Sequence, residues 1–166
     1  MAGIRVEIEI NATPERVWSV VEPVERHVDW MHDAVAIRFT GEQRRGTGTE
    51  FLCDTKVGPF TLVDRMEITE WQPPATEDGA QAAQGAQAAR GVMGVRHTGL
   101  VTGSGRFLLV PIDLGRRTRF VWEETLVFPW WMGGPIGAWV GGKVVLRAIW
   151  RRNLRGLRRV VEQPAG

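Results

Sequence analysis

Residues 4–18 read IRVEIEINATPERVW, and the first half of this stretch has the pattern of a β-strand. Isoleucine or valine alternates with a charged residue from Ile4 to Ile10, which makes one strand face apolar and the other charged. We therefore expect the fold to begin with a strand that has one face in water.

The second half of the stretch carries the signals of a helix start. Thr13 can cap a helix and Pro14 suits its first position, so a short helix is expected through about Val21. Pro23 ends this helix, and a second short helix is expected to run toward Trp30.

Six further strands are expected, because apolar runs alternate with turn residues in the middle of the chain. They cover about residues 35–39, 51–57, 60–71, 92–101, 107–112 and 118–128. Turns are expected at residues 46–48, 58–59 and 103–105 and near Gly115. The short connections imply antiparallel neighbours, so the sheet is expected to be a meander that closes back on the first strand.

A long amphipathic helix is expected from about Pro135 to Glu162. Its apolar stripe, which must lie on the sheet, consists of Trp139, Leu146, Trp150, Leu154, Leu157 and Val161. A neighbouring stripe changes from Val140 and Val144 to arginine from Arg147 onward. We therefore expect the front half of the helix to be enclosed more fully than the back half.

Length and composition indicate one domain over residues 1–166, long enough to bury a core and a cavity. Residues 75–91 contain a tandem repeat, GAQAAQ and GAQAAR, without any large apolar residue, so this stretch is expected to be a mobile loop insertion. Cys53 is the only cysteine, which excludes an internal disulfide, and no secretory signal opens the chain. A cytoplasmic location is expected.

The order of these elements resembles the helix-grip fold of the START-like, Bet v 1-like superfamily. The local motifs are residues 12–18 (ATPERVW), Trp30, residues 69–74 (TEWQPP) and residues 128–131 (FPWW). They are similar to those of bacterial polyketide cyclase/dehydrase-type (SRPBCC) proteins. The resemblance implies an α+β fold in which a seven-stranded curved antiparallel sheet wraps around the last helix. It also implies a tunnel for an apolar or aromatic molecule, but not catalysis, since such folds serve carriers, sensors and enzymes alike.

Three ionisable residues fall in phase with the apolar side chains of their strands: Asp64, His97 and Glu124. Burying an ionisable group without a partner shifts its pKa or destabilises the fold, so these positions are informative. If Trp71 lies opposite about residues 90–91 in an antiparallel hairpin, Asp64 comes opposite about His97.

Two interpretations of this group remain open. In the first, His97 is a general base or acid whose tautomer is fixed by Asp64, and it assists a cyclase or dehydratase reaction. In the second, Asp64, His97 and Glu124 satisfy one another as a structural polar network that also orients a ligand. A single β-bulge would change the strand phase and remove either arrangement.

The side chains expected to contact a ligand are Trp30, Phe51, Met66, Val95, Trp122, Glu124, Trp130, Val140 and Val144. Trp130 or Trp131 is expected to line the cavity mouth or to touch a lipid surface, and the favoured alternative is that this aromatic run packs as a loop under the last helix. No cofactor or metal is expected: His27 and His32 flank two aspartates, but no further ligand motif follows, and a solvent position at a helix end is simpler.

The arginines between residues 147 and 159 are expected to form a solvated helix face. Nucleic acid is not expected as a partner, because no aromatic residue is interleaved on that face. Transient membrane contact stays open, as does the choice between monomer and homodimer.

The sequence favours a carrier or sensor of a small hydrophobic ligand (lipid, polyketide or aromatic) that performs no chemistry. A polyketide cyclase or dehydratase is the alternative. It is less favoured than the carrier because no nucleophile, metal or cofactor motif supports an enzyme. An interaction module acting through the basic helix is the weaker third possibility.

Overall fold

The structure, a computed structural model, describes residues 2–57, 60–75, 90–127 and 143–163. Its strands are β1 (Ala2–Ile10), β2 (Ala34–Phe39), β3 (Glu50–Val57), β4 (Phe60–Gln72), β5 (Gly91–Thr98), β6 (Thr102–Ile112) and β7 (Arg117–Val127). Its helices are α1 (Pro14–Val21), the 3₁₀ helix η1 (Val24–Asp29) and α4 (Lys143–Glu162). Residues 79–89 of the tandem repeat lie outside the described residues, as do Trp130 and Val140.

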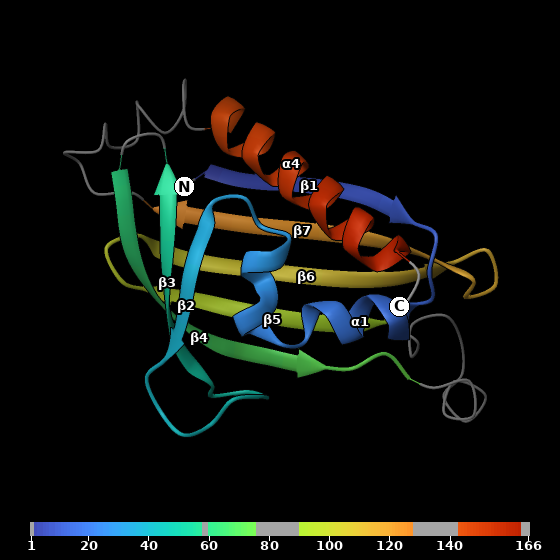
Figure 1. Ribbon diagram of the computed structural model, residues 1–166, viewed down its shortest axis with the longest axis horizontal. Helices are drawn as coiled ribbons and strands as arrows, with labels where there is room; N and C mark the ends of the chain where they lie inside the picture. The colour runs from blue at the N-terminus through green and yellow to red at the C-terminus, as the bar shows by residue number, and fades with distance from the viewer. Residues whose placement is uncertain (1, 58–59, 76–89, 128–142, 164–166) are drawn as a thin grey trace.

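The strands form one antiparallel sheet in the order β1-β7-β6-β5-β4-β3-β2, which confirms the predicted meander closed by the first strand. Figure 1 shows that α1, η1 and α4 all lie on the same face of this curved sheet. The core therefore forms between that concave face and the helices.

Helix α1 begins as the sequence predicts. Thr13 has an extended backbone, its hydroxyl accepts a hydrogen bond from the backbone N–H of Arg16 at 3.3 Å, and Pro14 is the first helical residue. The helix buries Val17 and Val21 completely. These features fix the start of α1 and the face that it turns toward the core.

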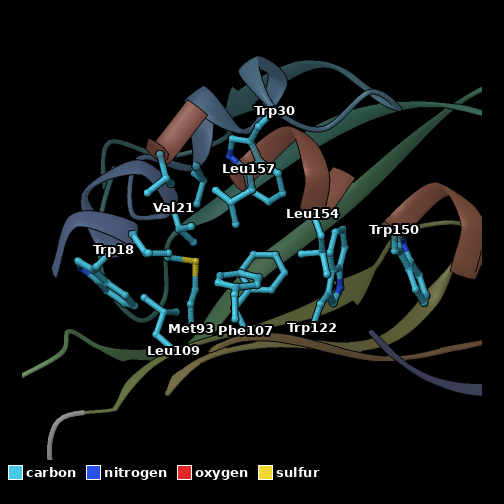
Figure 2. Packing of buried hydrophobic residues seen from close by; sticks show 14 of the residues in the cluster. Trp18, Val21, Trp30, Met93, Phe107, Leu109, Trp122, Trp150, Leu154 and Leu157 are labelled. Carbon is cyan, nitrogen blue, oxygen red and sulfur yellow. The ribbon is translucent and has the colours of Figure 1, made fainter. Parts of the chain in front are cut away.

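Aromatic side chains fill much of the space between the sheet and α4. Phe107 and Trp122 meet edge to face with ring centroids 5.1 Å apart, and Trp122 stacks on Trp150 at 5.4 Å. Figure 2 shows Phe107 and Trp122 pointing from the sheet toward Leu154 and Leu157 of α4.

The stripe predicted on the last helix is confirmed over its described part. Trp150, Leu154, Leu157 and Val161 are buried, Leu146 is partly buried, and the helix ends at Glu162 as expected. Residues 135–142, where the helix start was predicted, lie outside the described residues.

The prediction that the front half of this helix is more enclosed was wrong for the described residues. Val144 is 71% exposed and Val145 is 51% exposed, whereas the back half packs against β1 and α1. The back half also lies against the loop after η1: Asn153 hydrogen-bonds to that loop, and Gly156 lies against the carbonyl of Trp30.

The turn predicted at residues 103–105 lies instead at residues 99–101, because β5 ends at Thr98 and β6 begins at Thr102. Gly103 and Gly105 belong to β6, where glycine permits close approach. At Gly103, with φ of +145°, a Cβ would lie 2.0 Å from the carbonyl oxygen of Thr125. Gly103 and Gly105 thus allow neighbouring strands to approach β6 closely and do not form a turn.

The face of β2 also differs from the simple alternation of Val35, Ile37 and Phe39. A register shift between Ala34 and Ala36 places one extra residue in the strand, and Val35 is 57% exposed. The shift lets Ala34 and Ile37 both face the concave side of the sheet.

Gly156 provides a test of how α4 docks. A Cβ at this position would lie 2.4 Å from the carbonyl oxygen of Trp30, so Gly156→Ala is expected to destabilise the fold by roughly 1–3 kcal/mol. Helix propensity alone predicts a gain of up to about 1 kcal/mol for the same change. Urea unfolding measures the difference, with Gly41→Ala as the control because nothing lies within 4 Å of that position. A Gly156→Ala protein as stable as its parent would contradict the docking.

Candidate functional site

A cavity of about 140 Å³ lies between the concave face of the sheet and the helices. Its volume is close to that of an engineered apolar cavity of roughly 150 Å³ that binds benzene. Most of its walls are aliphatic, aromatic or sulfur-containing side chains from the six strands β2 to β7, η1, the loop that follows η1, and α4. The space therefore suits a small apolar ring or chain.

The structure brings five of the predicted ligand contacts to this cavity: Phe51, Met66, Val95, Trp122 and Glu124. Trp30 does not line it, because its ring packs in the core against Phe107 and Trp122. Val144 does not line it either, since the described front end of α4 turns this side chain outward.

Three ionisable side chains meet at one wall of the cavity, and we call them the acid–imidazole cluster: Asp64 on β4, His97 on β5 and Glu124 on β7. Nδ1 of His97 lies 2.5 Å from Oδ2 of Asp64, and Nε2 lies 3.0 Å from Oε1 of Glu124. The first contact is a hydrogen bond; the second is an ion pair without good hydrogen-bond alignment. All three residues are buried.

Asp64, His97 and Glu124 thus lie on the strand faces that the sequence predicted, but the pairing register of β4 with β5 differs from the predicted one. Met66 pairs with His97, and a shift between Ile68 and Glu70 makes Trp71 pair with Met93. The expected pairing of Trp71 with residues 90–91 was wrong. Asp64 consequently reaches His97 diagonally across the strand pair, a contact that long side chains can make.

Gly105 makes the second half of the cluster possible. Strand β6 separates β5 from β7, and Gly105 on β6 pairs with Val95 on one side and with Glu124 on the other. A Cβ at Gly105 would lie 3.1 Å from Cγ2 of Val95 and 3.5 Å from Oε1 of Glu124. The missing side chain leaves room for His97 and Glu124 to meet above the middle strand.

The cluster changes the protonation of its members. Burial by itself lowers the pKa of His97, but the hydrogen bond to Asp64 and the contact with Glu124 outweigh burial and raise the pKa to about 9. Burial raises the pKa of Glu124, although His97 and the indole N–H of Trp122, which donates to Oε2 at 3.1 Å, act the other way. At neutral pH the imidazole carries both protons, which favours the acid over the base among the roles expected for His97.

His27 is a residue whose position the sequence interpretation missed. It is buried and lines the cavity, its Nε2 donates to the carbonyl oxygen of Val21 at 2.6 Å, and burial lowers its pKa to about 4. The expected solvent position was wrong for His27, whereas His32 is exposed. The signal was present: His27 follows Val24 by three residues and shares its helical face.

Asp33 and Asn153 were also missed. Asp33 lines the cavity, and its Oδ1 accepts a hydrogen bond from Nδ2 of Asn153 at 2.6 Å. Oδ1 of Asn153 accepts from the backbone N–H of His32 at 2.9 Å, which ties the loop to α4. Asn153 is fully buried beside the apolar stripe, so its polarity there was a usable signal. No signal in the sequence indicated that Asp33 faces the cavity, because the spacing of apolar residues does not show which way a loop side chain points.

Outside the cavity, the arginines of α4 are exposed, as predicted. Among the described residues, the closest carboxylate contact of this face joins Arg158 to Glu162 at 3.9 Å. Within the described part of the chain, no helix combines the length and apolar character needed to cross a membrane. The same residues contain no group of three His, Cys, Asp or Glu side chains arranged to hold a metal ion.

Comparisons with known proteins agree with this architecture. A family model described as "Polyketide cyclase / dehydrase and lipid transport" matches residues 1–162. A START superfamily protein from Mycobacterium smegmatis superposes with a TM-score of 0.72 at 14% identity, covering 98% of this chain and 99% of that one. The Zhui aromatase/cyclase from Streptomyces sp. R1128 gives 0.68 at 17% identity, covering 99% and 98%.

The protein TTHA0849 from Thermus thermophilus gives a TM-score of 0.71 at 18% identity, covering 96% of this chain and 97% of that one. No curated protein matches the sequence. At these identities the structural similarity shows the fold, and it confirms the predicted α+β helix-grip architecture of START-like proteins.

The cluster predicts how stability depends on pH. Because the folded-state pKa of His97 is raised from 6.5 to about 9, its contribution is complete below pH 6.5 and is lost as the pH rises through about 9. The free energy of unfolding is therefore expected to fall across this interval. Urea titrations between pH 6.5 and 9.5 measure this slope.

His97→Gln is the control for that slope, because it removes the titrating imidazole. Its profile is expected to be flatter than that of the parent over the same interval. His27 acts only on the acid side, since its pKa is lowered, and does not interfere above pH 6.5. Equal slopes for parent and variant would show that His97 is not held in the protonated form.

Proposed function

The chain belongs to the polyketide cyclase / dehydrase and lipid transport family, and we propose that it is a carrier or sensor that holds a small apolar or aromatic molecule in its cavity. The observation that supports this most is an apolar cavity with a buried charged cluster in one wall. The apolar walls supply affinity, and the cluster supplies a fixed orientation.

A packing argument supports an occupant. Protein interiors are close-packed, and a void of this size costs roughly 3 kcal/mol at about 24 cal/mol per Å³. That cost is a large fraction of the stability of a typical domain. A ligand that fills the cavity recovers the lost contacts with Trp122, Met66 and Val95, so binding and stability are coupled.

The cluster also favours binding over turnover. Both ring nitrogens of His97 already face carboxylates, and the indole N–H of Trp122 already donates to Glu124. A polar group of a ligand meets side chains whose positions are fixed before it arrives, which reduces the entropy lost on binding.

A dehydratase or cyclase is the second candidate, and the protonated His97 in the cavity wall favours it. With a β-hydroxy carbonyl substrate, an ionised Glu124 would take the proton next to the carbonyl. The imidazolium of His97 would give its proton to the departing hydroxyl, which leaves as water and forms the conjugated double bond. Perturbed groups of this kind are common at catalytic sites, but structural ion pairs are perturbed too.

Toluene is a suitable probe of the carrier function, because it is small and has no polar group. Val95 lines the cavity, so Val95→Phe is expected to fill part of it and to weaken toluene binding by about tenfold or more. Val63→Phe is the matched control, since Val63 is 50% exposed on the other face of β4. Chemical shifts of ¹³C-methyl methionines report binding, because Met31, Met66 and Met93 line the cavity. If the parent shows no saturable shifts, the carrier proposal fails.

The dehydratase candidate is tested with the aldol adduct of benzaldehyde and acetone, whose dehydration gives a strongly absorbing enone. If the candidate is correct, the parent accelerates this reaction, and His97→Gln and Glu124→Gln each slow it by about 100-fold or more. Glu123→Gln, on the outer face of β7, should keep the parent rate. If the reaction is no faster with the parent protein than in buffer, the dehydratase candidate is rejected and the carrier function remains as the single proposal.

A further inference from the structure

The charged side chains that face the cavity are mostly acidic. Three carboxylates line it, those of Asp33, Asp64 and Glu124, and His97 is the one imidazolium among the described lining residues. His27 also faces the cavity but is neutral at pH 7, because burial holds its pKa low. Acidic groups therefore exceed basic ones at the polar wall.

No arginine compensates this excess from within the described residues. Arg106 is among the lining residues, but it is exposed and its guanidinium pairs with Glu70 at 2.8 Å. The α4 arginines point to solvent. Residues 128–142 carry no charged side chain at all.

Most hydrogen-bond donors beside these carboxylates are already used, but Nε2–H of His97 faces Oε1 of Glu124 at 3.0 Å without good hydrogen-bond alignment. Nδ1–H of His97 donates to Asp64, and Nε1–H of Trp122 donates to Glu124. Nδ2 of Asn153 donates to Asp33. Each carboxylate offers about four lone-pair sites, so acceptor capacity remains after these bonds are made. In particular, Oδ1 of Asp64 has no partner among the described residues.

A ligand that donates a hydrogen bond thus finds free acceptors, whereas a ligand that only accepts must compete with Glu124 for Nε2–H of His97. An anionic ligand would also place a like charge beside buried carboxylates, in surroundings that screen charge poorly. An ammonium or hydroxyl group would instead form charge-assisted hydrogen bonds with them.

We propose that the cavity selects small aromatic or apolar molecules that carry a hydroxyl or an amine, and that it rejects their carboxylate analogues. This selectivity rests on the proposed binding function, and it assigns Asp33, Asp64 and Glu124 as the groups that determine it. The ligand class is then a phenol, an alcohol or an amine, and not a free carboxylic acid.

Four probes of one shape test the proposal: toluene, p-cresol, p-methylbenzylamine and p-toluate. Their affinities at pH 7 are measured on the full chain from the ¹³C-methyl methionine shifts. We expect p-cresol and p-methylbenzylamine to bind about tenfold or more tightly than p-toluate. Glu124→Gln replaces a carboxylate, which only accepts hydrogen bonds, by an amide that can also donate them. This variant should therefore show a smaller difference between the affinities for p-cresol or p-methylbenzylamine and the affinity for p-toluate. Glu123→Gln on the outer face of β7, where Glu123 pairs with Arg5, should leave the preference unchanged.

The outcomes separate the two proposals. If toluene causes no saturable shifts, the binding function itself is overturned. If toluene binds but p-toluate binds as tightly as p-cresol, or more tightly, the selectivity is overturned while the binding function stands. The parent protein alone gives this answer, so the test holds even if Glu124→Gln does not fold.

Discussion

The imidazole of His97 lies between the carboxylates of Asp64 and Glu124, in a wall whose other side chains are mostly apolar. Removing one partner of such a buried ion pair typically costs roughly 3–5 kcal/mol, because an uncompensated charge remains. The cluster therefore constrains β4, β5 and β7 together and fixes where the polar wall of the cavity lies. It also explains the glycine at position 105, since a side chain on β6 would crowd the space in which His97 and Glu124 meet.

The opposite wall depends on how α4 is held. Asn153 and Gly156 attach the back half of the helix to the loop after η1, one through hydrogen bonds and the other through its lack of a side chain. The same loop carries Asp33 into the cavity. Helix docking and the polarity of the cavity thus share one short segment, so a change at either residue of α4 is expected to affect both.

Much of the fold was predictable, because strand alternation and helix stripes are local properties of the sequence. Alternation alone placed Asp64, His97 and Glu124 on the concave face, and the apolar stripe alone placed Leu154 and Leu157 on the sheet. The meander closed by the first strand was also correct, since short connections leave few alternatives, and the α+β helix-grip architecture implied by the family resemblance was confirmed.

The parts that failed depend on long-range packing. A bulge in β2 turned Val35 outward, and a register shift in β4 moved the partner of Trp71, although nothing local marks either position. The glycines at 103 and 105 suggested a turn, while their actual role is set by neighbours on β7 that are distant in sequence. Asp33 reaches the cavity from a loop, where residue spacing gives no direction.

A carrier function requires that the space between the sheet and α4 be hollow and admit a small apolar molecule beside the acid–imidazole cluster. A crystal structure determined after soaking with toluene tests it most directly. We expect electron density for toluene against Trp122 and Val95, with Asp64, His97 and Glu124 still in mutual contact. A cavity filled by inward-turned side chains, with no toluene in it, would rule out the proposed binding function.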